Sequence, residues 1–362
     1  MSAYATKLAE GFASKAAVLY YESAVSEKIT NADYEGEVKD KASKVNILTF
    51  GAVALKNYTS VAMTADDLTE SNAQLATDQA KAYYFKIRDL DQLKSYIKNP
   101  EGGILEQVRS LLAETIDAYV LGFYTDVASG NRLGTSFTTG TVTVDTVTGV
   151  VTHSGTSFAA DMVGKGFKAL GHTKWYRVKH YTSSSQIEIE DDLDDVASAY
   201  TGGAIAGGAT YEIQAYTALQ TTKALIYAHV NSLATILNEA KVPKSNRWLV
   251  VPAGVSGLIR QAPEYIPAVQ TAYDEVTKRG LIGMLAGFMV YENQQVAGDS
   301  VNGWHIMAGH QSGITFAMAM TQAKVEGDLI GDFGKAMKGL SVYGAKVIDE
   351  RRKALAEAFL KL

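Results

Sequence analysis

Alternating apolar and polar positions indicate two strands in the first hundred residues. In the stretch AKAYYFKIRDLDQLKS, residues 80–95, every second residue from Tyr83 to Ile87 is apolar, which is the period of a strand with one apolar face. A second strand is predicted at 45–48. The polar stretch 51–79 lies between these strands and contains short alternating patches, so it is predicted to be a long two-stranded loop that projects from the body. Loops of this length are usually functional or disordered.

The strongest helical pattern begins at Ile104 and continues to about Tyr124. Its apolar residues recur at the spacing of one helical face, at Val108, Leu111, Leu112, Ile116, Tyr119 and Val120. The acidic residues Glu106, Glu114 and Asp117 are predicted to lie on the opposite, polar face. The sequence PEGG just before the pattern is a natural start signal. A helix of roughly 20 residues or more is long enough to act as a structural spine.

The composition changes near Ser129, and residues 136–213 are rich in Gly, Thr, Ser and Val. Within them, 145–149 is predicted to be the turn of a hairpin, and 183–185 the turn between two alternating strands. The segment follows the spine helix and leaves through a Gly-rich stretch. We therefore expect a separate small β module that is inserted into the fold.

Mixed helix and strand patterns return after the β module. A helix is predicted within 219–242, a buried strand at 248–251, and another helix directly after Pro252. Two further strands are predicted at 314–325 and 340–348. The charged sequence DERRKALAEAFLKL, residues 349–362, is predicted to form a short closing helix.

Composition places the chain among globular proteins. Its 362 residues are 47% hydrophobic and 20% charged, and the length suggests two or three modules. The net charge of -5 disfavours a dedicated nucleic-acid binder but allows a container for nucleic acid. The chain has no Cys, which excludes disulfides and thiolate chemistry. Neither a signal-peptide pattern nor a run of ~20 apolar residues occurs, so we expect a soluble protein made in the cytoplasm.

Candidate chemical motifs do not form a coherent catalytic set. The glycines at 164, 166 and 171 lack dinucleotide-binding spacing, and GHQSG at 309–313 lacks the central Ser of a nucleophile elbow. The acidic run 191–195 is predicted to be a solvated turn rather than a calcium loop. Arg351, Arg352 and Lys353 are predicted to form a solvated helix face rather than a nucleic-acid contact. We expect neither enzymatic activity nor a cofactor or metal.

Four stretches of the chain follow one another in a recognisable order: LATDQAKAYYFKIRDLDQLKS, VPKSNRWLVVPAGVSGLIR, GLIGMLAGFMVYENQQV, and IMAGHQSGITFAMAMTQAKVE followed by DFGKAMKGLSVYGAKVIDE. This order resembles that of a known family, the major capsid proteins of tailed bacteriophages with the Hong Kong ninety-seven fold. In that family, the stretches are similar to the return from the extended loop (E-loop), the axial (A) domain, the glycine-punctuated strand, and the closing strands of the peripheral (P) domain.

This resemblance implies an α+β fold with the following division. The N-terminal arm would be 1–45, the E-loop 46–80, the P-domain strand and spine helix 81–135, the inserted all-β domain 136–213, the A domain 214–312, and the closing P-domain strands with a C-terminal helix 313–362. The short arm implies a separate scaffolding protein. The role of the inserted domain does not transfer from the family.

The implied function is a shell subunit that assembles into hexamers and pentamers of an icosahedral head around double-stranded DNA. Its implied partners are further copies of itself, scaffolding, portal and decoration proteins, and DNA by non-specific proximity, with no membrane. It would be made and assembled in the bacterial cytoplasm and end in the virion capsid. Expected assembly contacts are Lys56, Tyr58, Arg88, Asp89, Asp91, Arg351 and Arg352.

Two other functions remain open at this point. One is the shell of an encapsulin-like protein nanocompartment, which shares the fold. The other is a β-rich surface-binding protein that acts through residues 136–213.

Overall fold

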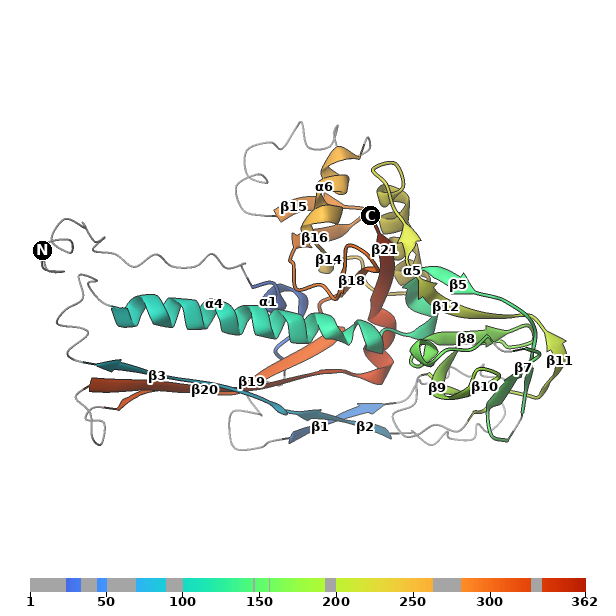
Figure 1. The fold of residues 1–362 in the computed structure, drawn as a ribbon, viewed down its shortest axis with the longest axis horizontal. Coiled ribbons are helices and arrows are strands. Elements are labelled where there is room, and N and C mark those ends of the chain that lie inside the picture. The colour runs from blue at the N-terminus through green and yellow to red at the C-terminus, as the bar shows by residue number, and fades with distance from the viewer. Residues whose placement is uncertain are drawn as a thin grey trace, which may run out of the picture.

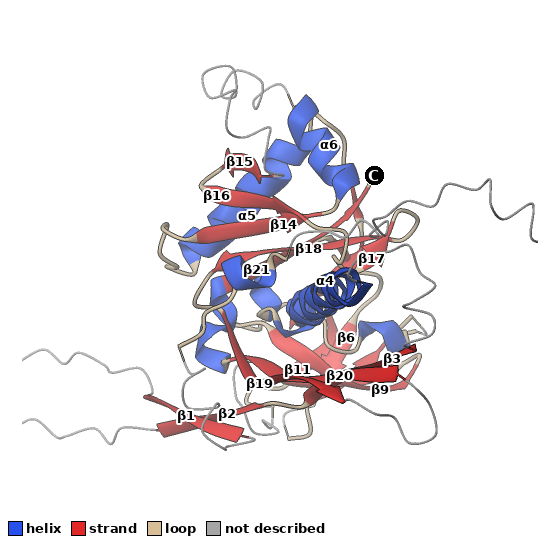
Figure 2. Cartoon of the chain, turned by 90° about the vertical axis from the view of Figure 1, so that its left-hand side faces the viewer, coloured by secondary structure: helices blue, strands red, loops and turns tan. Residues whose placement is uncertain are grey.

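The computed structural model describes residues 24–33, 44–50, 70–88, 100–145, 147–155, 157–192, 200–262, 281–326 and 334–362. Figure 1 shows a long helix and a narrow sheet side by side, a mixed α/β body above them, and a β module at one end. Seen along the long helix, the α/β body lies on one side of it and the narrow sheet on the other (Figure 2).

The long helix α4 (Pro100–Leu121) and the narrow sheet form an elongated platform. The sheet is antiparallel, with the order β19 (Ile314–Glu326), β20 (Gly334–Val347) and β3 (Gln79–Arg88). In β3, Tyr83 is partly buried and Tyr84 is 65% exposed, so the predicted alternation is confirmed. The predicted strands at 314–325 and 340–348 and the spine helix are confirmed as well.

A two-stranded ribbon lies against this platform. Strands β1 (Lys44–Phe50) and β2 (Glu70–Ala76) pair in unbroken antiparallel register. One face of the ribbon packs on the platform through apolar side chains, namely Val45, Ile47, Ala73 and Leu75 against Ala317 and Ile348. The strand predicted at 45–48 is confirmed, and the ribbon's far end leads into residues 51–69, which lie outside the described part of the chain.

The α/β body is built on a sheet whose two faces are both buried. Its main strand order is β13 (Leu219–Gln220), β21 (Leu355–Lys361), β18 (Gly303–His310), β14 (Arg247–Val251), β16 (Phe288–Glu292) and β15 (Leu281–Leu285); β17 (Gly298–Asp299) pairs with β18, and β4 (Arg132–Leu133) with β21. Helices α5 (Ile226–Glu239) and α6 (Ala253–Gln261) cover one face.

Strand β14 shows why a fully apolar run was needed in this sheet. Leu249 and Val251 point into the core formed with α5 and α6. Trp248 and Val250 point the opposite way, into a second core shared with the spine helix. Because successive side chains of a strand face opposite sides, the four residues 248–251 between the two cores are all apolar, whereas Arg247 at the start of the strand is buried with its guanidinium group donating to the carbonyl oxygens of Pro243 and Val242. The buried strand and the helix after Pro252 are therefore confirmed.

The predicted closing helix is wrong. Residues Asp349–Ala354 form a short 3-10 helix, η4, and Leu355–Lys361 form strand β21 in the interior of the sheet. The sequence LAEAFLK is rich in good helix formers, but pairing on both sides of β21 outweighs this local preference. The chain thus returns to the α/β body after the platform strands instead of ending as a surface helix.

The predicted β module is an eight-stranded sheet with its own apolar core. Its strand order is β11 (Ile205–Ala209), β6 (Val142–Val144), β7 (Val150–His153), β10 (Gln186–Asp191), β9 (Tyr176–Ser183), β8 (Gly166–Ala169), β12 (Tyr211–Thr217) and β5 (Thr135–Phe137). The predicted hairpin and strand pair are confirmed. The strands extend slightly beyond 136–213 at both ends.

Short helices occupy the connections. The helix α1 (Ser26–Ile29) lies in the arm, and the 3-10 turns η1 (Gly122–Asp126) and η2 (Ser129–Asn131) join the spine to the insertion. A further 3-10 turn, η3 (Ala160–Met162), lies within the β module. The spine thus continues as η1 directly into the region where the insertion begins.

Gly344 allows the ribbon to approach the platform closely. A Cβ atom at this position would lie 2.0 Å from the carbonyl oxygen of Ala76 and 2.9 Å from the Cα atom of Thr77. We predict that Gly344→Ala lowers the free energy of unfolding by about 1–3 kcal/mol, because backbone atoms must shift to make room. Urea unfolding of the unassembled chain measures this change.

The matched control is Gly257→Ala in α6, where no atom lies within 4 Å of the added Cβ. Alanine is favoured over glycine inside a helix by roughly 0.5–1 kcal/mol, so this variant should be unchanged or more stable. Equal unfolding midpoints for both variants and the parent would contradict the close approach.

Candidate functional site

The two connections of the insertion converge on one strand of the α/β body. The incoming strand β4 pairs in parallel with β21, with Arg132 opposite Glu357. The outgoing strand β13 also pairs in parallel with β21, with Leu219 opposite Leu360. Strand β21 therefore holds both ends of the insertion, and we call the surrounding polar contacts among residues 125–132, 192, 305, 352 and 357 the junction.

Arg132 is the first centre of the junction. Its side chain is 6% exposed, and Nη2 donates to the carbonyl oxygens of Thr125 at 2.7 Å and Val127 at 2.9 Å. Its Nη1 lies 3.5 Å from Oε2 of Glu357, which is 2% exposed. Burial lowers the pKa of Arg132, and the charge of Glu357 acts in the opposite direction. The carboxylate thus supplies the counter-charge for an arginine that binds the end of the spine.

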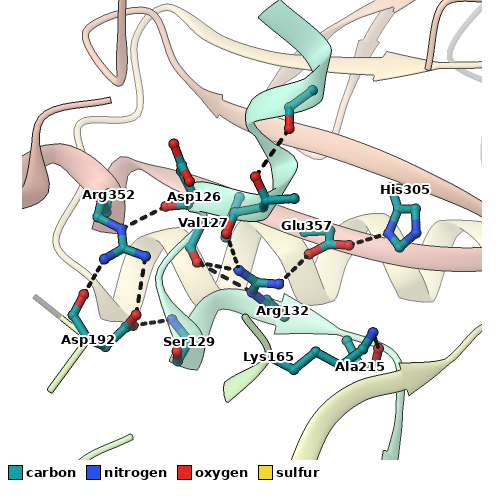
Figure 3. A network of polar contacts seen from close by, with 12 residues as sticks. Asp126, Val127, Ser129, Arg132, Lys165, Asp192, Ala215, His305, Arg352 and Glu357 are labelled. Atoms are coloured by element: carbon teal, nitrogen blue, oxygen red, sulfur yellow. Dashed lines mark hydrogen bonds and ion pairs between the residues drawn. The ribbon is translucent and has the colours of Figure 1, made fainter. Parts of the chain in front are cut away.

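Glu357 has a second partner in His305. The Nδ1 atom of His305 lies 2.5 Å from Oε1 of Glu357. The imidazole is stacked between two aromatic rings, with centroid distances of 4.2 Å to Tyr124 and 4.1 Å to Phe359. Burial and the charge of Glu357 raise the pKa of Tyr124. Figure 3 shows the resulting chain of contacts from Arg132 through Glu357 to His305.

Arg352 is the second centre, and it joins the insertion to the spine. Its Nη2 lies 3.2 Å from Oδ1 of Asp192, its Nη1 also donates to the carbonyl oxygen of Asp192, and its Nε donates to that of Asp126 at 2.8 Å (Figure 3). Asp192 in turn accepts the backbone N–H of Ser129 at 2.5 Å. One guanidinium group therefore binds the spine end and the last described residue before position 200 of the insertion.

These contacts correct two predictions. The acidic turn is not solvated at its start, because Asp191 and Asp192 are 5% and 7% exposed and are paired with Lys174 and Arg352. The run from Arg351 does not form a solvated helix face, since Arg352 is 5% exposed. The expectation that Arg352 is an assembly contact remains a prediction; within the chain, its guanidinium group binds Asp192 and Asp126.

The other predicted assembly residues remain predictions. Lys56, Tyr58, Asp89 and Asp91 lie outside the described residues. Arg88 ends strand β3, with its backbone opposite Gly334. Arg351 is partly buried, and its Nη1 donates to the carbonyl oxygen of Ser312 at 3.3 Å.

A third polar centre fastens the arm to the spine. The carboxylate of Asp117, in α4, accepts the backbone N–H groups of Val25 and Ser26, both at 2.9 Å, and the side-chain amide of Asn293 at 2.6 Å. Asp117 is 2% exposed, so its prediction on a polar face of the spine is wrong. The periodicity of the helix in the sequence carries no information about the arm, which covers this face of the helix in the fold.

The His and Ser side chains of GHQSG, residues 309–313, make a local contact. His310 Nδ1 lies 2.8 Å from Ser312 Oγ, but the same nitrogen accepts the backbone N–H of Ser312 at 3.2 Å, which is a local turn contact. Within the described ranges, no group of three or more His, Cys, Asp or Glu residues is placed to hold a metal ion. In that same part of the chain, no helix is long and apolar enough to span a membrane.

We expect the loss of a buried carboxylate at the junction, Glu357, to destabilise the fold much more than the loss of an exposed carboxylate, Glu188. Glu357→Gln keeps the side-chain shape but leaves the buried charge of Arg132 without its counter-charge, so we expect the free energy of unfolding to fall by about 3–5 kcal/mol. Chemical denaturation measures this loss.

Glu188→Gln is the matched control. Glu188 pairs with Lys179 at 3.1 Å, with side chains 35% and 40% exposed, and a pair of this kind contributes less than about 1 kcal/mol. Similar losses in the two variants would show that the junction does not depend on the buried ion pair.

Comparison with known proteins gives structural matches only. No protein-family model and no curated protein sequence matches the chain. A structure from Mycobacterium phage Che8 matches with a TM-score of 0.58 at 17% identity and covers 96% of both chains. The capsid structure of cyanophage P-SCSP1u matches with a TM-score of 0.57 at 10% identity, over 97% of this chain and 92% of that one. The capsid of cyanophage Pam1 matches with a TM-score of 0.55 at 11% identity, over 97% and 96%. The chain therefore has the fold of phage capsid structures over nearly its whole length.

Proposed function

We propose that this chain is the major capsid protein of a tailed bacteriophage, which assembles into hexamers and pentamers of an icosahedral head that encloses double-stranded DNA. The observation that carries the proposal is the extent of the structural match, which covers 96% or more of this chain and 92% or more of three phage structures. A match of this extent includes the platform, the α/β body and the insertion together, so it is not a resemblance of one common module.

The arrangement of the elements fits this role. In the proposed division, α4 is the spine helix, the sheet of β3, β19 and β20 belongs to the P domain, and the ribbon β1–β2 is the base of the E-loop. The α/β body is the A domain, to which we add strand β21. The elongated platform offers a long edge for contacts with neighbouring copies, and many weak contacts of this kind become strong together when a shell closes.

The proposed partners follow from this role. The chain would contact further copies of itself, with Lys56, Tyr58, Arg88, Asp89, Asp91, Arg351 and Arg352 as assembly contacts. It would also contact scaffolding, portal and decoration proteins. DNA would be enclosed by proximity, since a net charge of -5 gives the chain no overall attraction for a polyanion. The role is structural rather than enzymatic, and it places the mature protein in the virion after assembly in the host cytoplasm.

Particle mass and shape test the proposal. The full chain is co-expressed with the scaffolding gene that accompanies it and examined by sedimentation and negative-stain imaging. We expect closed shells of megadalton mass. A soluble monomer in the presence of scaffold would contradict the proposal and would direct attention to ligands of the β module.

A further inference from the structure

A histidine at the outer rim of the β module joins two segments that are separate in the sequence. The rim consists of the turn at 169–172, which follows β8, and the segment 200–205, which leads into β11. His172 Nε2 lies 2.7 Å from Oη of Tyr200, and Tyr200 Oη donates to the carbonyl oxygen of Gly203 at 2.8 Å. On the other side, the backbone N–H of Ala169 donates to His172 Nδ1 at 3.3 Å.

These contacts define the protonation state of the imidazole. The single proton of Tyr200 Oη is used toward Gly203, so this oxygen accepts from His172 and Nε2 carries a proton. Nδ1 accepts from Ala169 and therefore carries none. Only the neutral imidazole satisfies both contacts. A second proton on Nδ1 would face the N–H of Ala169, donor against donor.

The surroundings of His172 also disfavour a charged ring. Its imidazole packs against Phe167, Tyr176 and Tyr200, with centroid distances of 6.0, 4.5 and 5.8 Å. Burial, with a smaller contribution from the positive charge of Lys168 on β8, lowers the pKa of His172 from 6.5 to about 4. Just before the neighbouring strand β9, Lys174 lies with its Nζ 5.5 Å from the ring centroid of Tyr176, the first residue of that strand.

One carboxylate belongs to the same rim. Asp191, on β10, binds Lys174 Nζ at 2.6 Å and accepts from Thr201 Oγ1 at 2.5 Å. Burial acts to raise the pKa of Asp191, but the hydrogen bonds from Lys174 and Thr201 outweigh it, and the pKa lies below the ordinary 3.8. Asp191 therefore stays charged over the pH range in which His172 takes up a proton, and its hydrogen bond with Thr201 is kept in that range.

The same two segments line a hollow in the surface. Its volume is about 440 Å³, and it is lined on one side by Leu170, Gly171 and His172 and on the other by Gly203, Ala204 and Ile205. Leu170 is already 73% exposed. The hydrogen bonds of His172 thus connect the two walls of this hollow.

We propose that His172 is an acid-released latch: protonation of its imidazole separates the turn at 169–172 from the segment 200–205 and opens the hollow between them. Above pH 6.5 the imidazole is neutral whether the rim is closed or open, so the latch holds. As the pH falls from 6.5 toward 4, the open rim takes up the proton first and gains population. Below about pH 4 both states are protonated, and the effect reaches its limit.

Hydrogen–deuterium exchange of the full chain between pH 7.5 and 4.5 tests the latch, with exchange times corrected for the intrinsic pH dependence. We expect the corrected exchange rate of peptides over 166–176 and 200–210 to rise at least ~10-fold. This factor is smaller than the one that the full pKa difference of His172 would give, because the side chain is only partly buried and solvent weakens the effect. Peptides of the buried strand β14 should not change. A parallel rise in β14 would mean general acid unfolding and would overturn the proposal.

Two substitutions identify the titrating group. His172→Gln should remove the acid response of the rim, whereas His180→Gln, at an exposed histidine of the same module, should leave it intact. The module also contains a buried histidine, His153, with Nε2 at 2.8 Å from the Thr139 carbonyl oxygen and Nδ1 accepting from the N–H of Gly155. Peptides over 137–155 report on it separately. An acid response that persists in His172→Gln would overturn the latch.

Tyr200→Phe provides a test that does not depend on the folding of the His172 variant. It keeps the ring but removes the oxygen that joins His172 to Gly203. We expect the 200–205 segment to exchange faster already at pH 7.5, with a smaller further rise in acid. A Tyr200→Phe chain with the closed rim and the acid response of the parent would also overturn the proposal.

Discussion

A charge buried in a protein interior is costly unless a counter-charge and hydrogen bonds compensate for it, and this constraint determines how the parts of the chain meet at the junction. Arg132 and Arg352 both donate to carbonyl oxygens at the end of the spine, which helical hydrogen bonding leaves open. Their counter-charges come from elsewhere, Glu357 from β21 and Asp192 from the insertion. Each arginine thus links the end of the spine to a carboxylate on another part of the chain, one on β21 and one in the insertion.

The spine helix also contains a buried charge that hydrogen bonds compensate. One region packs against the α/β body and the platform sheet at once, with Ile116 and Val120 in a core that also contains Trp248 and Tyr343. Asp117 lies within this apolar surface and is compensated by the arm and by Asn293. The C-terminal end of the helix is therefore a shared core element whose one buried carboxylate, Asp117, binds the backbone of residues 25 and 26, whereas Leu111 farther along the helix is 56% exposed.

Local patterns predicted much of this architecture. The period of two in β3 and the fully apolar run of β14 are decided by which faces are buried, and such patterns are visible in a single sequence. The prediction of β21 failed because its residues favour a helix by themselves and become a strand only between distant partners. The roles of Asp117, Asp192 and Arg352 could not be predicted, because their partners lie between 63 and 226 positions away. Spacing along the chain carries no information about such pairs.

The position of β21 has a consequence for how the protein is made. A ribosome releases β4, β13 and β18 before it has synthesised residues 355–361, yet all three strands pair with β21. Until then, the edge of β18 and both connections of the insertion lack their partner, although the β module already has the residues of its own core. The nascent chain thus carries a foldable module on an incomplete sheet, and exposed strand edges of this kind are where chains aggregate.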